Sequence, residues 1–352
     1  MSRHLCYAIG LTVGALSFAA CGEDTTTQPS SPADPSLTPP SLATASNSWA
    51  PIAPMPQQNG QGPAVGVVPN SVGPSKAYVF GGTDGAGGSG AGIRVYDVAA
   101  NTWRIISNAT ETRVFAFNLN GVGNIGDKLY FSGGKDFGGG SLAITSAVWA
   151  FDPVTETLSR KADMPLHTAD GVSGVIGDKL YVLPGTCSGD GWPAAGWCQV
   201  EPIRKLFRYN PATNIWVTKA SAPHFHKNGA GGVVNNKFYV AGGQDDRLNP
   251  TRNLDVYDPA SNTWKTLAPL PTALNGVVGA VLQGQLFVIG TNSSGSIRHY
   301  AYNPTSNKWN TKAVPSHYGG PAAKVFLNGT SRLLVLEGAT VDNPDGSQIY
   351  TP

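Results

Sequence analysis

The chain has 352 residues, and its composition limits the classes of protein to which it can belong. It contains 44 glycines and 27 prolines, whereas only 13% of its residues are charged. Abundant turn residues without a long amphipathic run predict an all-β fold with many turns. The 24 basic and 22 acidic side chains give a net charge of +2 without any Lys/Arg run. No nucleic-acid partner is therefore predicted, because nucleic-acid binding needs clustered positive charge.

The first segment of the chain has the pattern of an export signal. Arg3 precedes an apolar run from Leu5 to Phe18, and small residues stand before Cys21. This order predicts a signal peptide over residues 1–20, and the apolar run is shorter than the ~20 residues of a spanning helix. Phe18-Ala19-Ala20-Cys21 resembles a bacterial lipobox, although Leu is usual at the position of Phe18. Cys21 is thus the expected lipidation site, with ordinary cleavage near Ala20 as the alternative.

Residues 21–46 are rich in Thr, Ser and Pro. Such a stretch buries too little apolar surface to order itself, so it predicts a disordered tether. A lipid, a tether and a globular head together predict an exported protein of the cell envelope, held to the membrane by its N-terminal lipid. With two membranes the outer one is expected, because Gly22 does not resemble the Asp that retains some lipoproteins in the inner membrane. Without lipidation, the protein is expected to be secreted.

A short motif then recurs along the rest of the chain. A Tyr or Phe followed by Asp or Asn precedes a Trp or Leu by seven residues, as in Tyr96/Trp103, Phe151/Leu158, Tyr209/Trp216, Tyr257/Trp264 and Tyr302/Trp309. The distance between successive units varies more, for example 45 residues from Trp264 to Trp309 and 58 from Leu158 to Trp216. A constant short spacing inside a variable long one indicates a repeated supersecondary unit with loop insertions.

One unit shows four predicted strands clearly. The tight turn Asn235-Asn236 tolerates the positive φ of a two-residue hairpin, and Gly242-Gly243 ends the second strand. The predicted strands are Gly229–Val234, Lys237–Ala241, Leu254–Tyr257 and Thr263–Leu267.

A period near 50 residues with diglycine, Tyr and Trp marks is typical of kelch repeats, so the chain resembles the kelch-repeat family of β-propellers. The resemblance implies blades of four antiparallel strands. Diglycines are intact at residues 81–82, 133–134 and 242–243 and degenerate at Pro184-Gly185, Ile289-Gly290 and Glu337-Gly338. We therefore predict one six-bladed propeller over residues 47–352. The last unit lacks a Trp after Tyr350, while Trp49 lacks a preceding Tyr, so the N-terminal strand is expected to close the sixth blade.

Two cysteines lie in the predicted head, Cys187 and Cys198, both within the longest insertion, Gly185–Ile203. In an exported chain this pair predicts a disulfide. A metal-binding pair is the alternative, but no Cys-x-x-Cys or nearby His accompanies them.

The kelch resemblance also implies ligand sites in the loops around one end of the central channel. Polar residues precede the innermost strands of the predicted blades, and we expect the following to form a ligand-binding channel mouth: Asn59, Arg113, His167, Asp170, His226, Asn228, Asn275 and His317. Turn formation alone also explains Asn or Asp before Gly, and the histidines are equally compatible with surface or hydrogen-bonding roles. Neither a metal nor a cofactor is predicted, because no carboxylate stands at a matching spacing from the histidines.

The resemblance favours a binding or interaction module with a protein or carbohydrate ligand. A carbohydrate-active enzyme, such as a sugar-acid mutarotase or epimerase, is the alternative, because exported bacterial kelch proteins include six-bladed sialic-acid mutarotases. Arg113 and Arg252 would then hold a carboxylate, and Glu201 would act as acid or base. No catalytic motif of that group is matched, and no Gly-x-Ser-x-Gly is present.

Overall fold

The computed structural model describes residues 45–56, 62–69, 74–82, 93–106, 118–136, 143–188, 204–317, 319–336 and 346–352. All of them belong to one compact unit, Pro39–Pro352. The predicted signal peptide and nearly all of the predicted tether lie outside the described residues. Within the described part of the chain, no helix has the length and apolar character needed to cross a membrane.

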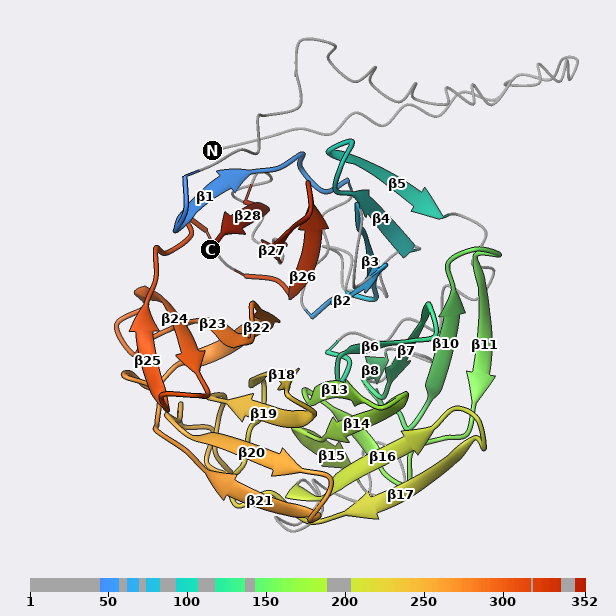
Figure 1. Ribbon diagram of the computed structural model, residues 1–352. Helices are drawn as coiled ribbons and strands as arrows, with labels where there is room; N and C mark the ends of the chain where they lie inside the picture. The colour runs from blue at the N-terminus through green and yellow to red at the C-terminus, as the bar shows by residue number, and fades with distance from the viewer. Residues whose placement is uncertain are drawn as a thin grey trace, which may run out of the picture. The chain divides into compact units, whose positions relative to one another are not determined.

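Six four-stranded antiparallel sheets surround a common axis as the blades of a propeller (Figure 1). Blade 1 consists of β2 (Ala64–Val68), β3 (Lys76–Phe80), β4 (Ile93–Asp97) and β5 (Thr102–Ile106). Blade 2 consists of β6 (Val122–Ile125), β7 (Lys128–Ser132), β10 (Val148–Asp152) and β11 (Thr157–Lys161). Blade 3 consists of β13 (Val172–Ile176), β14 (Lys179–Leu183), β16 (Leu206–Asn210) and β17 (Ile215–Lys219).

The remaining blades follow in chain order. Blade 4 consists of β18 (Ala230–Val234), β19 (Lys237–Ala241), β20 (Leu254–Asp258) and β21 (Thr263–Thr266). Blade 5 consists of β22 (Asn275–Leu282), β23 (Gln285–Thr291), β24 (Ile297–Asn303) and β25 (Lys308–Thr311). Blade 6 consists of β26 (Ala322–Leu327), β27 (Thr330–Val335), β28 (Gln348–Thr351) and β1 (Ser48–Pro51). Two short ribbons, β8–β9 (Lys135–Asp136 and Ala143–Ile144) and β12–β15 (His167–Ala169 and Thr186–Ser188), extend from blades 2 and 3.

The two ends of the described chain meet in blade 6 (Figure 1). Strand β1 pairs antiparallel with β28, and Trp49 lies opposite Tyr350 with ring centroids 5.1 Å apart. The prediction that the N-terminal strand completes the sixth blade is confirmed. The chain is an all-β, six-bladed propeller with four antiparallel strands in each blade.

The repeated Tyr and Trp residues belong to a hydrogen-bonded unit that joins each blade to the segment before it. In blade 4, the hydroxyl of Tyr257 donates to Asn262 Oδ1 over 2.8 Å. The same oxygen accepts the backbone N–H of Ala220 at 3.2 Å, and Trp264 Nε1 donates to the Ala220 carbonyl at 2.8 Å. Asn262 has a φ of 54°, a left-handed conformation that Asn tolerates better than most residues. We call this arrangement the latch.

The latch recurs in five blades, and blade 2 lacks it. The other four copies are Tyr96/Asn101/Trp103 on Ala53, Tyr209/Asn214/Trp216 on Ala162, Tyr302/Asn307/Trp309 on Ala268, and Tyr350/Asn47/Trp49 on Ala313. In blade 2 the corresponding residues are Phe151, Glu156 and Leu158, which supply neither the hydroxyl nor the indole N–H. Glu156 instead pairs with Arg104 of blade 1.

The diglycine pairs end the second strand because their backbone is left-handed. Gly242 and Gly243 have φ values of 63° and 82°. In blade 5 no such pair interrupts the strand, so β23 continues to Thr291. The pairing of Leu282 with Gln285 shows that Gly290-Thr291 occupies the diglycine position. The alignment that placed Ile289-Gly290 there was wrong by one residue.

Candidate functional site

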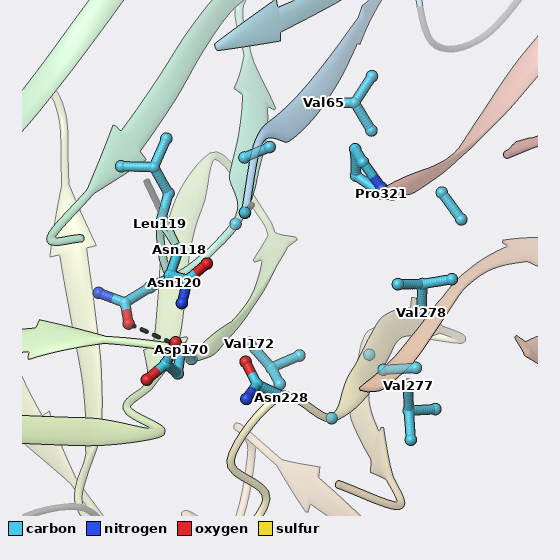
Figure 2. Close-up of a pocket in the computed structure, with 18 of the residues that line it drawn as sticks. Val65, Asn118, Leu119, Asn120, Asp170, Val172, Asn228, Val277, Val278 and Pro321 are labelled. Atoms are coloured by element: carbon cyan, nitrogen blue, oxygen red, sulfur yellow. Dashed lines mark hydrogen bonds between the residues drawn. The ribbon is translucent and has the colours of Figure 1, made fainter. Parts of the chain in front are cut away.

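The innermost strands enclose a cavity of about 480 Å³ at the end where each of these strands begins. All six blades contribute to its wall, and the wall is asymmetric (Figure 2). Polar side chains come from blades 2 to 4, namely Asn118, Asn120, Asp170, Ser173 and Asn228. Figure 2 shows the opposite side to be apolar, formed by Val65, Val277, Val278 and Pro321 of blades 1, 5 and 6.

Backbone hydrogen bonds connect successive blades around this mouth. Each bond runs from an N–H of one blade to a carbonyl of the blade before it: Asn118 to Gly62 (2.6 Å), Asp170 to Asn118 (2.9 Å), Asn228 to Asp170 (2.8 Å) and Val277 to Asn228 (3.0 Å). We call this series the mouth ring. Asn118, Asp170 and Asn228 have φ values of 54°, 58° and 52°. The recurring Asn or Asp is therefore needed for a left-handed turn and an inter-blade hydrogen bond.

The carboxylate of Asp170 is an inter-blade contact. Its side chain has no exposed area, although the residue borders the cavity. It accepts Lys135 Nζ of blade 2 at 2.8 Å and Thr186 Oγ1 of blade 3 at 2.9 Å, and Lys227 Nζ of blade 4 lies 3.9 Å away. Its oxygens are enclosed and already paired between blades, and its predicted contact with a ligand stays a prediction.

Two carboxamides face the cavity without a protein partner. Within the described residues, the side chains of Asn118 and Asn228 make no hydrogen bond to protein, and both are partly exposed (Figure 2). Asn120 differs, because it is fully buried, donates to Thr168 Oγ1 at 2.6 Å and accepts the N–H of Gly171 at 3.1 Å. Sequence reasoning missed Asn118 and Asn120, although the run Asn118 to Gly121 contains an Asn-Gly pair like those of other blades.

His226 belongs to a buried network away from the cavity. It is 2% exposed, its Nδ1 donates to the Gly242 carbonyl at 2.9 Å, and its Nε2 lies 3.1 Å from Asp255 Oδ2. Asp255 also binds His224 Nδ1 at 3.0 Å and Thr266 Oγ1 at 2.8 Å. Burial by itself raises the pKa of Asp255, but hydrogen bonds and charge from His226, with Thr266 and His224, outweigh it and hold that pKa below its ordinary value. The predicted position of His226 at the mouth was wrong, because the imidazole turns toward β20.

Three other predicted residues do not border the cavity either. His167 lies on β12 opposite Ser188 of the same ribbon. Asn275 is exposed, and its side-chain oxygen accepts the N–H of Gly276 at 2.9 Å. His317 is exposed, with Nδ1 3.1 Å from Ser316 Oγ. Of the six predicted residues that the structure describes, Asp170 and Asn228 border the cavity and the other four do not.

Several predicted residues lie outside the described part of the chain, namely Cys21, Asn59, Arg113, Cys198 and Glu201. Cys187 is 2% exposed and lies opposite Thr168 in the β12–β15 ribbon, and its pairing with Cys198 stays a prediction. Arg252 donates from Nε to the Leu270 carbonyl. Among the described residues, no group of three or more His, Cys, Asp or Glu side chains is placed to hold a metal ion.

Comparison with known proteins agrees with this architecture. Residues 227–271, which contain blade 4, match the Kelch motif. The chain is 26% identical to human Kelch-like protein 38 over 185 residues, 51% of this chain and 26% of that protein. It is 29% identical to the F-box/kelch-repeat protein At1g22040 of Arabidopsis thaliana over 102 residues, 29% of this chain and 19% of that protein. These matches support a kelch-repeat family, and they span about a quarter or less of each relative.

A solved structure resembles this chain over most of its length. The structure of YjhT aligns with a TM-score of 0.61 at 15% identity, covering 85% of this chain and 95% of YjhT. At this identity the likeness shows the fold alone.

Proposed function

We propose that the chain is a binding module whose protein or carbohydrate ligand docks at the channel mouth. The carboxamides of Asn118 and Asn228, which face a 480 Å³ cavity without protein partners, carry this proposal. The volume lies within the range of small-molecule and side-chain pockets. Matches to kelch proteins support a binding role, since kelch propellers are typical interaction modules.

The mouth ring supports the proposal because it fixes the backbone from which the two carboxamides extend. The backbone of Asn118 hydrogen-bonds to Gly62 and Asp170, and that of Asn228 to Asp170 and Val277. A site that is already ordered loses little conformational entropy when a ligand binds. Each carboxamide offers two N–H donors and one acceptor oxygen, which suits a peptide group or a sugar hydroxyl. The valines opposite would contact the apolar side of the same ligand.

The enzyme alternative has no support among the described residues. Arg252 is engaged with a backbone carbonyl, whereas Arg113 and Glu201 lie outside the described part of the chain. We therefore favour a binding module over an enzyme as the function of this chain.

Export and lipid anchoring form the second part of the proposal. They rest on the Arg3, apolar and Phe18-Ala19-Ala20-Cys21 pattern and on the Thr/Ser/Pro-rich stretch that follows it. An exported location also favours a Cys187–Cys198 disulfide, which the intact mass of alkylated protein with and without reductant would detect. Lipidation would place the propeller at the surface of a membrane, where a tethered binding module meets ligands of the cell envelope.

Glycine substitutions test the mouth directly. Asn118→Gly and Asn228→Gly remove the carboxamides but keep the left-handed backbone that both positions require. Asn235→Gly is the matched control, since Asn235 has a φ of 49° in the β18–β19 turn and does not border the cavity. For a ligand found by a glycan array or a peptide screen, the double variant should bind at least about tenfold more weakly, and the control should bind normally. Unchanged affinity of the double variant would remove the mouth as the binding site.

A further inference from the structure

The cavity at the mouth is two-sided because one left-handed position differs between blades. In blades 2 to 4 this position carries Asn118, Asp170 and Asn228, with φ values of 54°, 58° and 52°. In blades 1 and 5 the corresponding turns contain glycine instead, Gly62 with a φ of 72° and Gly276 with a φ of 56°. Both kinds of residue adopt this backbone, but only Asn and Asp place a polar side chain at the mouth. The residue at this position therefore decides which side of the cavity is polar.

Three side chains on the polar side have hydrogen-bonding groups to offer a ligand. Asn118, Ser173 and Asn228 border the cavity on three consecutive blades, and all three residues are partly exposed. Within the described residues, none of these side chains forms a hydrogen bond to protein. A carboxamide or a hydroxyl both donates and accepts, so a ligand group that also does both would satisfy it.

This set of donors and acceptors favours an uncharged amide over an ionised group. A secondary amide has one N–H donor and one acceptor oxygen, whereas a carboxylate only accepts and an ammonium only donates. A charged group would also lose hydration on entry, and the carboxylate of Asp170 at this wall is already paired with Lys135. Peptide groups therefore match the polar side better than acidic or basic side chains do.

The opposite side of the cavity matches an aliphatic side chain. Figure 2 shows Val65, Val278 and Pro321 across the cavity from Asn118 and Asn228. Burial of an aliphatic group against these residues is favourable in proportion to its apolar area. A peptide unit separates its polar backbone from such a side chain. A sugar ring carries hydroxyls around its periphery, and those that face this side would lose water without gaining a hydrogen-bonding partner.

We propose that the mouth recognises an uncharged peptide segment with an aliphatic side chain. The peptide groups hydrogen-bond to the carboxamides of Asn118 and Asn228, and the aliphatic side chain lies against Val278. This inference rests on the binding function proposed above, and it narrows the ligand from a protein or carbohydrate to one class of peptide. Val278 is then a residue that determines specificity.

Isosteric peptides test the proposed ligand class on the unsubstituted protein. The probes are tripeptides with acetylated and amidated ends, in which leucine, asparagine or aspartate stands between two glycines, and maltotriose is the carbohydrate probe. NMR titration of the isotope-labelled full chain follows the side-chain amide signals of Asn118 and Asn228. The leucine peptide should shift both signals saturably, and the other three probes should bind at least about tenfold more weakly. Unshifted signals with the leucine peptide, or equal or tighter binding of any other probe, would overturn the proposal.

Val278→Thr separates this proposal from the function on which it rests. Thr has the shape of Val but replaces a methyl group by a hydroxyl, so the variant should bind the leucine peptide about fourfold more weakly. Val217→Thr, at an exposed position of the outer strand β17, is the matched control and should bind normally. Equal binding by Val278→Thr and the unsubstituted protein would overturn the aliphatic contact. If the double variant Asn118→Gly, Asn228→Gly then still weakens binding of a screened ligand, the mouth remains the binding site and only the ligand class fails.

Discussion

His299 occupies a buried position at the seam where the ring closes. Its Nδ1 donates to the Ala313 carbonyl at 2.7 Å, and its ring contacts Trp49 and Tyr350 of blade 6 at 5.5 and 4.8 Å. Burial, with a smaller effect of the Lys312 charge, lowers the pKa of His299 to about 4, against the opposing effect of the bond to Ala313. The imidazole is therefore neutral in the folded protein at neutral pH.

The seam should lose stability in mild acid. The folded pKa of His299 is about 4 and the unfolded value 6.5, so the unfolded chain binds more protons between these values, and stability falls as the pH drops from 6.5 to 4. The expected loss from this residue is about 3 kcal/mol. Urea unfolding of the protein and of His299→Phe across this range measures it.

His317→Gln is the control for the seam experiment, because His317 is exposed. The slope of unfolding free energy against pH should become shallower in His299→Phe and stay unchanged in His317→Gln. A slope that is equal in all three proteins would show that His299 does not carry this pH dependence.

Single residues also show why the site was harder to predict than the repeat. Asp170 and Asn228 were predicted at the mouth and do border the cavity. His226 stands two residues before Asn228, yet its ring turns to Asp255. Side-chain direction here depends on left-handed residues and on partners in distant strands, neither of which the spacing of residues reveals.

At the scale of the element, the latch explains why Tyr and Trp recur at a constant spacing. The sequence contains Asn two residues before Trp in every latched blade, for example Asn262 before Trp264. The spacing of the aromatic residues revealed the repeat, but the role of the Asn was missed, because its partner Ala220 lies 42 residues earlier in the chain. The role of the Asn became apparent only when the segment before the blade was seen beside it.

Removing one latch should destabilise the propeller without changing its backbone. Asn262→Gly keeps the left-handed conformation but leaves the Tyr257 hydroxyl and the Ala220 N–H without their acceptor. Loss of two hydrogen bonds at partly buried donors should lower the free energy of unfolding by about 2 kcal/mol. Asn236→Gly, which has a φ of 58° in the β18–β19 turn, should change it by less than about 0.5 kcal/mol. Equal effects of the two substitutions, measured by urea unfolding, would reject the role of the latch.

At the scale of the whole molecule, closure by β1 removes the exposed edge that an open blade 6 would present. A head that begins at Ala45 contains β1 and Asn47, whereas a head that begins at Ile52 lacks the pairing of Trp49 with Tyr350. Loss of the Trp49 contacts alone is worth about 3 kcal/mol, which corresponds to a melting temperature lower by about 5 °C for a head of this size. Calorimetry of the two heads measures this difference. Equal melting temperatures would show that β1 is dispensable.

Anchoring is also a property of the whole chain. If Cys21 carries lipid, the unmodified protein should sediment with membranes and Cys21→Ser should remain in the soluble fraction, because each buried CH₂ contributes about 0.8 kcal/mol. Fractionation with quantitative immunoblotting measures the partition. Equal partition of both proteins would exclude the lipid anchor.

The central claim is that a ligand binds in the mouth between Asn118 and Asn228. A crystal structure of the full propeller with the first ligand identified by screening tests it most directly. We expect ligand density within the 480 Å³ cavity, with hydrogen bonds to both carboxamides and contact with Val278 on the opposite wall. Density confined to the outer strands or to the Gly185–Ile203 insertion, with an empty mouth, would contradict the account.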